Sequence, residues 1–305
     1  MEGINSEFIY DLRRMGSLNM IQWCQKVGLL ASRRVCNVCQ KEMKFIERKD
    51  KKDGFEWICR ERTVNIHCVK MSVRKDSWFE HSHMEIWKVL LITYMWVMEA
   101  RVDHICLDVG VNESTVTDWM SFCREVCFVV FENESEPLGG EGVVVEIYES
   151  KFGKRKYNRG KRVEGKWVFG GVERGSSRCF FKVVECRSKD ILLDIIKNYI
   201  KPKSILISDC WKAYDCLKDE GFTHLKVNHS ITFKDPESGA HTNSIEGTWS
   251  AIKRSFPRHK VNNALIYYLC EYVWRRQFRT EKFNNFCTFI KKIYDVNKEV
   301  VGSKK

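Results

Sequence analysis

The spacing of apolar residues changes along the chain. Apolar positions lie three or four residues apart in residues 1–30, and the same period returns from Met84 to about Phe131, where Asp103 and Gly110 interrupt it. This period is typical of helices that bury one face. We therefore expect one or two short helices at the start of the chain and a helical region with turns in its middle.

After the glycine-rich segment 138–142 the pattern becomes that of strands. β-rich runs separated by glycine and basic residues predict an antiparallel meander, after which helices alternate with short buried strands. The expected strands are 143–147, 167–172, 179–184, 204–208 and 224–227, and the expected helices are 188–200, 211–220 and one that begins near Thr242. This order predicts a mixed five-stranded sheet closed by a helix, which resembles the ribonuclease H-like arrangement of many nucleases and integrases.

The charge of the chain favours a polyanionic partner. Lysine and arginine number 52 against 40 acids, a net charge of +12, which would suit DNA, RNA or an anionic membrane surface. The longest apolar stretch, Val89 to Met98, is about half as long as the roughly 20 residues of a membrane-spanning helix, and the start of the chain lacks the pattern of a secretory signal. The 14 cysteines are too few for a disulfide scaffold. We expect a soluble protein in a reducing, intracellular compartment.

Some of the cysteines have the spacing of a zinc site. Cys36 and Cys39 form a close pair, and Cys59 and Cys68 supply two further thiolates, with His67 as an alternative to Cys68. Four such ligands suit a tetrahedral structural zinc ion. Free cysteines can also simply pack in a core, but basic residues surround these, and a module this small would have little core without a metal. A zinc ribbon that contacts DNA phosphates is expected.

Residues 105–125 have the pattern of a helix, a glycine turn and a second helix with Asn112 or Ser114 as its N-cap. A helix-turn-helix of this kind would present Thr115 and Thr117 to DNA. A plain helical hairpin in a scaffold gives the same pattern, so both interpretations remain open.

Two acids and a lysine occupy positions that suit catalysis. Asp209 directly follows a buried strand, at the edge where open sheets place active sites, although an aspartate before a helix can also be an N-cap. Glu246 and Lys253 lie about two helical turns apart on one line of the expected helix, where they could equally form a surface pair.

Short motifs follow one another in a specific order. They are the cysteine pairs, Ser72-Val73-Arg74 with Ser77-Trp78-Phe79, Glu149-Ser150-Lys151-Phe152-Gly153, Trp167-Val168-Phe169-Gly170-Gly171, Asp209-Cys210-Trp211 with Tyr214, His241-Thr242-Asn243, Ile245-Glu246-Gly247-Thr248-Trp249 and Tyr272-Val273-Trp274-Arg275. Over nearly the whole chain this series resembles the Merlin superfamily of eukaryotic cut-and-paste transposases and their bacterial insertion-sequence relatives.

The resemblance implies a catalytic site. Asp209 and Glu246 would be the second and third acids of an Asp-Asp-Glu triad that holds Mg²⁺ or Mn²⁺, with Lys253 against a DNA phosphate and Asn243 at the DNA. In that chemistry two divalent ions, about 3.5–4 Å apart, activate the attacking oxygen and stabilise the leaving one. The substrate would be double-stranded DNA, bound by a homodimer or a larger synaptic complex.

The sequence departs from the family at one position. Tyr148 stands where the first aspartate belongs, and a phenol with a pKa near 10 is a weak, neutral ligand. Glu149 would point to the other side of the strand, whereas Glu146 would lie on the same side but roughly 6.6 Å back along it. We expect impaired chemistry, with rescue by Glu146 or Glu149 as the alternative.

A basic stretch between the first two expected strands is well placed to hold DNA backbone. The residues concerned are Lys151, Lys154, Arg155, Lys156, Arg159, Lys161 and Arg162. A solvated charge run or a nuclear-import signal would have the same composition.

These patterns predict a multidomain chain whose first part is helical with a zinc ribbon and whose second part is an α/β ribonuclease H-like domain. The expected segments are N-terminal helices at 1–30, a zinc ribbon at 31–80, a helix-turn-helix region at 81–137, the ribonuclease H-like domain at 138–262, C-terminal helices at 263–296 and a disordered tail at 297–305. Three functions are compatible with this organisation: a transposase-derived DNA-binding protein with impaired strand transfer, an active transposase with a substitute ligand, and a host regulator that only binds DNA. The expected compartment is the nucleus if the source is eukaryotic.

Overall fold

A computed structural model describes residues 3–153, 165–227, 240–256 and 264–297. The chain divides into two compact units, one that joins Met1–Val130 to Thr280–Lys305 and one that spans Phe131–Arg279. The C-terminal helices that the sequence groups together belong to different units, α8 (Leu265–Gln277) to the second and α9 (Lys282–Ile293) to the first. The finer division into six segments stays a prediction.

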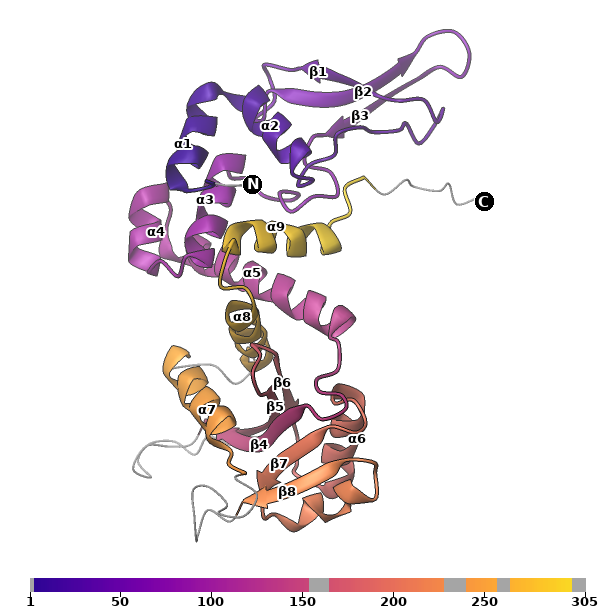
Figure 1. The fold of residues 1–305 in the computed structure, drawn as a ribbon. Helices are drawn as coiled ribbons and strands as arrows, with labels where there is room; N and C mark the ends of the chain where they lie inside the picture. Colours follow the sequence, from indigo (N-terminus) through magenta and orange to yellow (C-terminus); the bar gives the residue numbers. More distant parts are fainter. Residues whose placement is uncertain (1–2, 154–164, 228–239, 257–263, 298–305) are drawn as a thin grey trace. The chain divides into compact units, whose positions relative to one another are not determined.

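The first unit combines helices with a small antiparallel sheet (Figure 1). Its other elements are α1 (Ser6–Met15), α2 (Ser17–Lys26), β1 (Lys44–Glu47), β2 (Phe55–Glu61), β3 (His67–Ser72), α3 (Ile86–Val97), α4 (Val102–Val109) and most of α5 (Glu113–Glu134). Helix α1 starts where the Asn5 Oδ1 atom accepts a hydrogen bond from the Phe8 N–H at 2.8 Å, a standard N-cap. Helix α3 is apolar and buried around nearly its whole circumference and packs against α1, α4 and α9, so it forms the centre of this unit.

The second unit is built on a mixed five-stranded sheet in the order β6-β5-β4-β7-β8. The strands are β4 (Val144–Phe152), β5 (Lys166–Glu173), β6 (Cys179–Val184), β7 (Ile205–Asp209) and β8 (Thr223–Val227). Strands β4, β5 and β6 pair antiparallel, whereas β7 pairs parallel with both β4 and β8. The predicted sheet and the predicted order of its strands are confirmed.

Helices cover both faces of this sheet (Figure 1). Helix α6 (Lys189–Tyr199) packs on one face, in a core that includes Ile147 and Phe169. Helices α7 (Asn243–Ser255) and α8 pack on the other face, around Phe181 and Trp249. Gly170 permits the close approach of α7, since a Cβ atom there would lie 2.5 Å from Phe181 and 2.9 Å from Trp249.

Two segments of the second unit differ clearly from the sequence prediction, one in its end and one in its type of helix. Strand β4 runs on to Phe152, beyond its predicted end at Ile147, because pairing with β5 continues through this stretch. The segment predicted as the helix 211–220 is a 3₁₀ helix, η2 (Lys212–Lys218), which buries Tyr214 and Leu217. Residues three apart are eclipsed in a 3₁₀ helix, so this geometry brings both side chains onto the same side. Among the described residues, no helix is long and apolar enough to cross a membrane.

Candidate functional site

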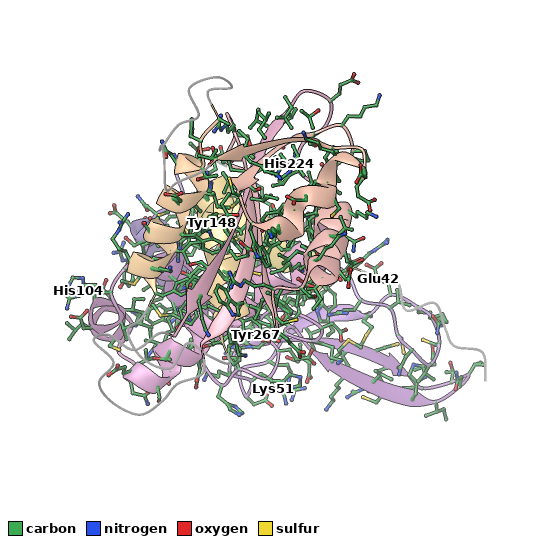
Figure 2. The ribbon with its side chains drawn as sticks, turned by 90° about the horizontal axis from the view of Figure 1, so that it is seen from below. Glu42, Lys51, His104, Tyr148, His224 and Tyr267 are labelled. Carbon is green, nitrogen blue, oxygen red and sulfur yellow. The ribbon has the colours of Figure 1, made fainter. Side chains whose placement is uncertain are left out.

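The predicted catalytic positions meet at the edge of the five-stranded sheet where β4 and β7 point the same way. The two strands are parallel, with Glu146 beside Ile207. The same offset continued by two residues places Tyr148 level with Asp209, the last residue of β7. Glu246 lies in the first turn of α7, which contacts β4. The structure therefore brings together the three positions that the sequence assigns to a triad (Tyr148 is labelled in Figure 2).

The Tyr148 hydroxyl is neutral in this setting. Burial raises the pKa of Tyr148 above its ordinary value, and the negative charges of Asp209, Glu246 and Glu149 raise it further, against a smaller opposite effect of Arg187. A phenol gives up its proton only near pH 10 even in water. The side chain at the first position is therefore an uncharged group surrounded by carboxylates.

Asp209 and Glu246 are both partly exposed, and both accept a hydrogen bond from a residue nearby in the chain. The Asp209 Oδ1 atom accepts from the Trp211 N–H at 3.1 Å, while Trp211 itself is the N-cap of η2, so Asp209 is not the cap of that helix. The Glu246 Oε1 atom accepts from the Thr242 hydroxyl at 2.7 Å. These bonds help to orient the two carboxylates at the edge of the sheet.

Lys253 lies two turns beyond Glu246 on α7 and is exposed. Its ammonium nitrogen stands 5.5 Å from the centroid of the Phe152 ring, at the end of β4. The predicted lysine is thus on the α7 side of the sheet, as Tyr148 is. Its contact with DNA stays a prediction.

Glu146 has a structural role. Its side chain is 0% exposed and accepts hydrogen bonds from the Arg174 Nε atom at 2.6 Å and from the Ile245 N–H at 2.9 Å. Ile245 is in the first turn of α7, where backbone N–H groups have no partner within the helix. Arg174 also donates to the His241 carbonyl at 2.6 Å. Glu146 therefore fixes the start of α7 on the sheet, and its carboxylate is already committed to these donors.

Glu149 is different, although it is almost as deeply buried. It is 6% exposed, and its Oε1 atom has no hydrogen-bond partner among the described residues. Burial raises the pKa of Glu149, and Asp209 raises it further, while the nearby Tyr214 hydroxyl lowers it. Tyr214 belongs to the core on the α6 side, so Glu149 points away from the Tyr148 side, as strand alternation predicts.

A second site lies in the first unit, in the ribbon of β1, β2 and β3. Cys36, Cys39, Cys59 and His67 each place one ligand atom so that all four atoms lie within 4.8 Å of one another. The Cys39 and Cys59 sulfur atoms are 3.5 Å apart, and the His67 Nε2 atom is 3.4 Å from the Cys59 sulfur. Three thiols and one imidazole at these separations fit a tetrahedral zinc ion.

The structure places His67 with the three cysteines and leaves Cys68 outside the cluster, which favours the alternative fourth ligand that the sequence named over its first choice. The two residues are neighbours on β3 and point to opposite faces, which leaves Cys68 exposed. The His67 Nδ1 atom lies 2.6 Å from the Asn65 carbonyl oxygen, which assigns the proton to Nδ1 and leaves Nε2 as the ligand atom. Although burial acts in the opposite direction, the N–H groups of Cys39 and Val38 lower the pKa of Cys36 to about 7, which favours a thiolate.

Two helices, α4 and α5, flank the predicted turn, while their role as a helix-turn-helix stays a prediction. Helix α4 ends at Gly110, whose left-handed φ of 67° suits glycine, and the Asn112 Oδ1 atom accepts from the Thr115 N–H at 2.8 Å at the start of α5. Thr117 is exposed and Thr115 half-buried. Contact of this surface with DNA stays a prediction.

Most of the predicted basic stretch lies outside the described residues. Lys151 lies on β4 opposite Trp167 of β5. Its ammonium nitrogen is 5.4 Å from the centroid of the Trp167 ring. Lys154, Arg155, Lys156, Arg159, Lys161 and Arg162 are not described, and neither is the tail after Asn297. Asn243 is exposed at the first position of α7.

Comparison with known proteins identifies the class. Residues 135–277 match the profile of the ISXO2-like transposase domain. An uncharacterized transposase-like protein of Haemophilus influenzae is 34% identical over 86 residues, which are 28% of this chain and 68% of that protein. The edge of the five-stranded sheet that carries Asp209 and Glu246 is called the acidic edge below. The sheet with this edge is therefore that of a transposase. The chain belongs to the ISXO2-like family of DDE transposases, which confirms the predicted resemblance to insertion-sequence enzymes.

Two solved structures show a distant likeness to this chain. The mariner Mos1 paired-end complex with Mg is 11% identical, with 71% of this chain and 79% of that chain covered and a TM-score of 0.29. An intasome of simian T-cell lymphotropic virus is 13% identical, with 60% and 67% covered and a TM-score of 0.28. These scores are low, and the family assignment rests on sequence.

Proposed function

We propose that this chain is a transposase-derived protein that binds double-stranded DNA through a ribonuclease H-like domain and a zinc ribbon, and that its strand-transfer chemistry is impaired. The observation that carries the proposal is the neutral Tyr148 phenol beside Asp209 and Glu246. On this proposal Asp209 and Glu246 would be two of the family's three acids, and the first anionic ligand would be missing.

Asp209 and Glu246 suit one hard divalent ion such as Mg²⁺ or Mn²⁺, since both are partly exposed carboxylates at one edge of the sheet. When two such ions are bound, they activate the attacking oxygen and stabilise the leaving oxygen. Tyr148 offers a neutral oxygen where the second ion needs an anion. The residues present therefore fit a one-ion site and do not fit a two-ion site.

Residual activity through a substitute ligand is the second candidate function, and one observation favours Glu149 over Glu146. Glu146 is held by Arg174 and by the start of α7, so moving it to a metal would break that junction. The Glu149 Oε1 atom has no hydrogen-bond partner among the described residues, and the carboxylate is close enough to Asp209 for that charge to raise its pKa. The position of Glu149 on the opposite side of the strand from Tyr148 argues against it as a substitute ligand.

The parts outside the acidic edge support DNA binding that does not depend on catalysis. A zinc ion held by Cys36, Cys39, Cys59 and His67 would keep the ribbon folded, and the basic residues of the 151–166 stretch would contact phosphates. A host regulator that binds DNA without cutting would use the same parts. Assembly as a homodimer or a larger synaptic complex and a nuclear location in a eukaryote belong to the same proposal.

The test is DNA cleavage and strand transfer on a duplex that carries the element's ends, with Mg²⁺ or Mn²⁺. We expect no cleavage by the native chain and cleavage by Tyr148→Asp. Tyr148→Phe is the matched control, because it keeps the ring but supplies no anion, and Tyr148→Asp combined with Asp209→Asn should be inactive again. Cleavage by the native chain would refute the proposed impairment, and loss of that cleavage in Glu149→Gln would then assign the substitute ligand.

A further inference from the structure

An arginine that the sequence analysis did not single out is held by two tryptophan rings near the acidic edge. Arg187 is exposed in the connection between β6 and α6. The central carbon of its guanidinium group stands 3.8 Å from the ring centroid of Trp167 and 5.2 Å from that of Trp211. Cation–π contacts of this length orient a guanidinium group.

The strand register places this cluster beside the candidate site. Trp167, near the start of β5, pairs with Lys151 of β4 and with Val184 of β6, and Trp211 follows Asp209 by two residues. Both rings pack against the core on the α6 side. Arg187 is thus at the same edge as Asp209, on the face opposite to α7.

The N–H groups of Arg187 have few partners within the described residues. Within the described parts of the chain, Arg187 has contacts with the two rings and forms no ion pair or hydrogen bond. Its charge nevertheless acts on the edge, because it opposes the larger effect of burial on the pKa values of Tyr148 and Glu149. An exposed arginine that two rings orient, with N–H groups not used within the described residues, is suited to donate to two oxygens of one anion.

We propose that Arg187, oriented by Trp167 and Trp211, binds a backbone phosphate of the DNA strand that lies along the acidic edge. This inference rests on the proposed DNA binding and does not require catalysis. A guanidinium group can donate two parallel hydrogen bonds to one phosphate. Its positive charge also offsets the repulsion between that phosphate and the carboxylates of Asp209, Glu246 and Glu149. Arg187 is therefore a positioning residue for the strand.

The test measures how DNA affinity depends on salt. Affinity for a fluorescently labelled, mixed-sequence duplex is titrated over a series of salt concentrations for the native chain, Arg187→Gln, Arg187→Lys and Arg279→Gln. Arg279 is a matched control, because it is an exposed arginine of the same unit for which no aromatic contact is recorded among the described residues. The logarithm of affinity falls linearly with the logarithm of salt concentration, and loss of one phosphate contact on B-DNA makes this slope shallower by about 0.9.

We expect Arg187→Gln to reduce the slope by this amount and Arg279→Gln to leave it unchanged. Arg187→Lys should restore the slope but not the full affinity, because an ammonium group keeps the charge but lacks the planar pair of donors. Recovery by lysine also separates a phosphate contact from a general loss of structure, which the thermal unfolding midpoint of each variant monitors independently.

Two outcomes would overturn the inference alone. One is an unchanged slope in Arg187→Gln while the native chain binds DNA. The other is a loss of affinity that is equal at all salt concentrations. It would indicate that the Trp167 and Trp211 rings stack on a base and that Arg187 does not contact a phosphate. Absence of any DNA binding by the native chain would instead refute the proposed function, and the inference would fall with it.

Discussion

Replacement of Glu146 by alanine should destabilise the second unit strongly. The carboxylate is 0% exposed, pairs with Arg174 at 2.6 Å and accepts from the Ile245 N–H at 2.9 Å. Breaking a buried ion pair by removing one partner costs about 3–5 kcal/mol, because the other charge stays buried without compensation. Arg174 is partly exposed and keeps its bond to the His241 carbonyl, so the lower part of this range applies to the pair. Loss of the contact at the start of α7 adds about 1 kcal/mol.

The total is about 4 kcal/mol. A change of about 1 kcal/mol shifts the unfolding midpoint of a domain of roughly 150 residues by about 2–4 °C, so the midpoint of this unit should fall by about 8–16 °C. Differential scanning calorimetry measures it. Glu146→Gln keeps an acceptor for the Ile245 N–H and should lose less.

The outcome also decides between two roles for Glu146. An unfolding midpoint within about 2 °C of native in Glu146→Ala would refute the structural reasoning, because such a shift is about 1 kcal/mol or less. If the same variant, made in the Tyr148→Asp chain, kept its midpoint but no longer cleaved DNA, Glu146 would be a metal ligand. We expect the opposite pattern, in which stability falls and the acidic edge fails only as the unit unfolds.

Two further predictions concern the ribbon and Glu149. Cys59→Ser should release the metal and unfold the ribbon. Cys68→Ser should keep the native metal content, because Cys68 points away from the ligand cluster. Elemental analysis of protein purified without chelator measures the metal content of both variants, and loss of metal in Cys68→Ser would contradict the assignment. Burial and Asp209 raise the pKa of Glu149 above the ordinary value of 4.5, so the fold favours the protonated form. The stability that this carboxyl contributes is complete below pH 4.5 and is lost as pH rises through the raised folded pKa. Glu149→Gln should therefore be at least as stable as the native chain at neutral pH and less dependent on pH; a variant that is much less stable than the native chain at pH 7 would contradict this sign.

Some features of the candidate sites could be predicted from the sequence, and others could not. Tyr148, Asp209 and Glu246 could be assigned to the triad from the sequence, because the motifs around them follow one another in a fixed order. In the structure Asp209 ends β7 and Glu246 is in the first turn of α7, whereas Tyr148 lies inside β4. Their convergence at one edge followed from the predicted sheet order. The sequence prediction preferred Cys68 to His67, because cysteine spacing does not reveal which neighbour on a strand faces the other ligands. The alternation of side chains on β3 could have decided between the two, had the strand register been known.

Arg187 carries no signal in the sequence. It is one of many basic residues, and its distinction comes from its contacts with Trp167 on β5 and with Trp211, the N-cap of η2. The role of Glu146 was likewise hidden, because its partners Arg174 and Ile245 are distant in the chain. Contacts between side chains on different elements depend on register and packing, which periodicity does not specify.

The sequence by itself determined the element order, the mixed sheet, the family and the substitution of the first acid by Tyr148. These features are local or are carried by motifs, and hydrophobic period and turn residues act over short stretches of chain. Tertiary structure alone decided that Glu146 anchors α7, that His67 completes the metal cluster and that Arg187 stands beside the acidic edge. Each of these depends on which atoms meet after the chain has folded, and the free energy of burying polar groups only with suitable partners selects those meetings.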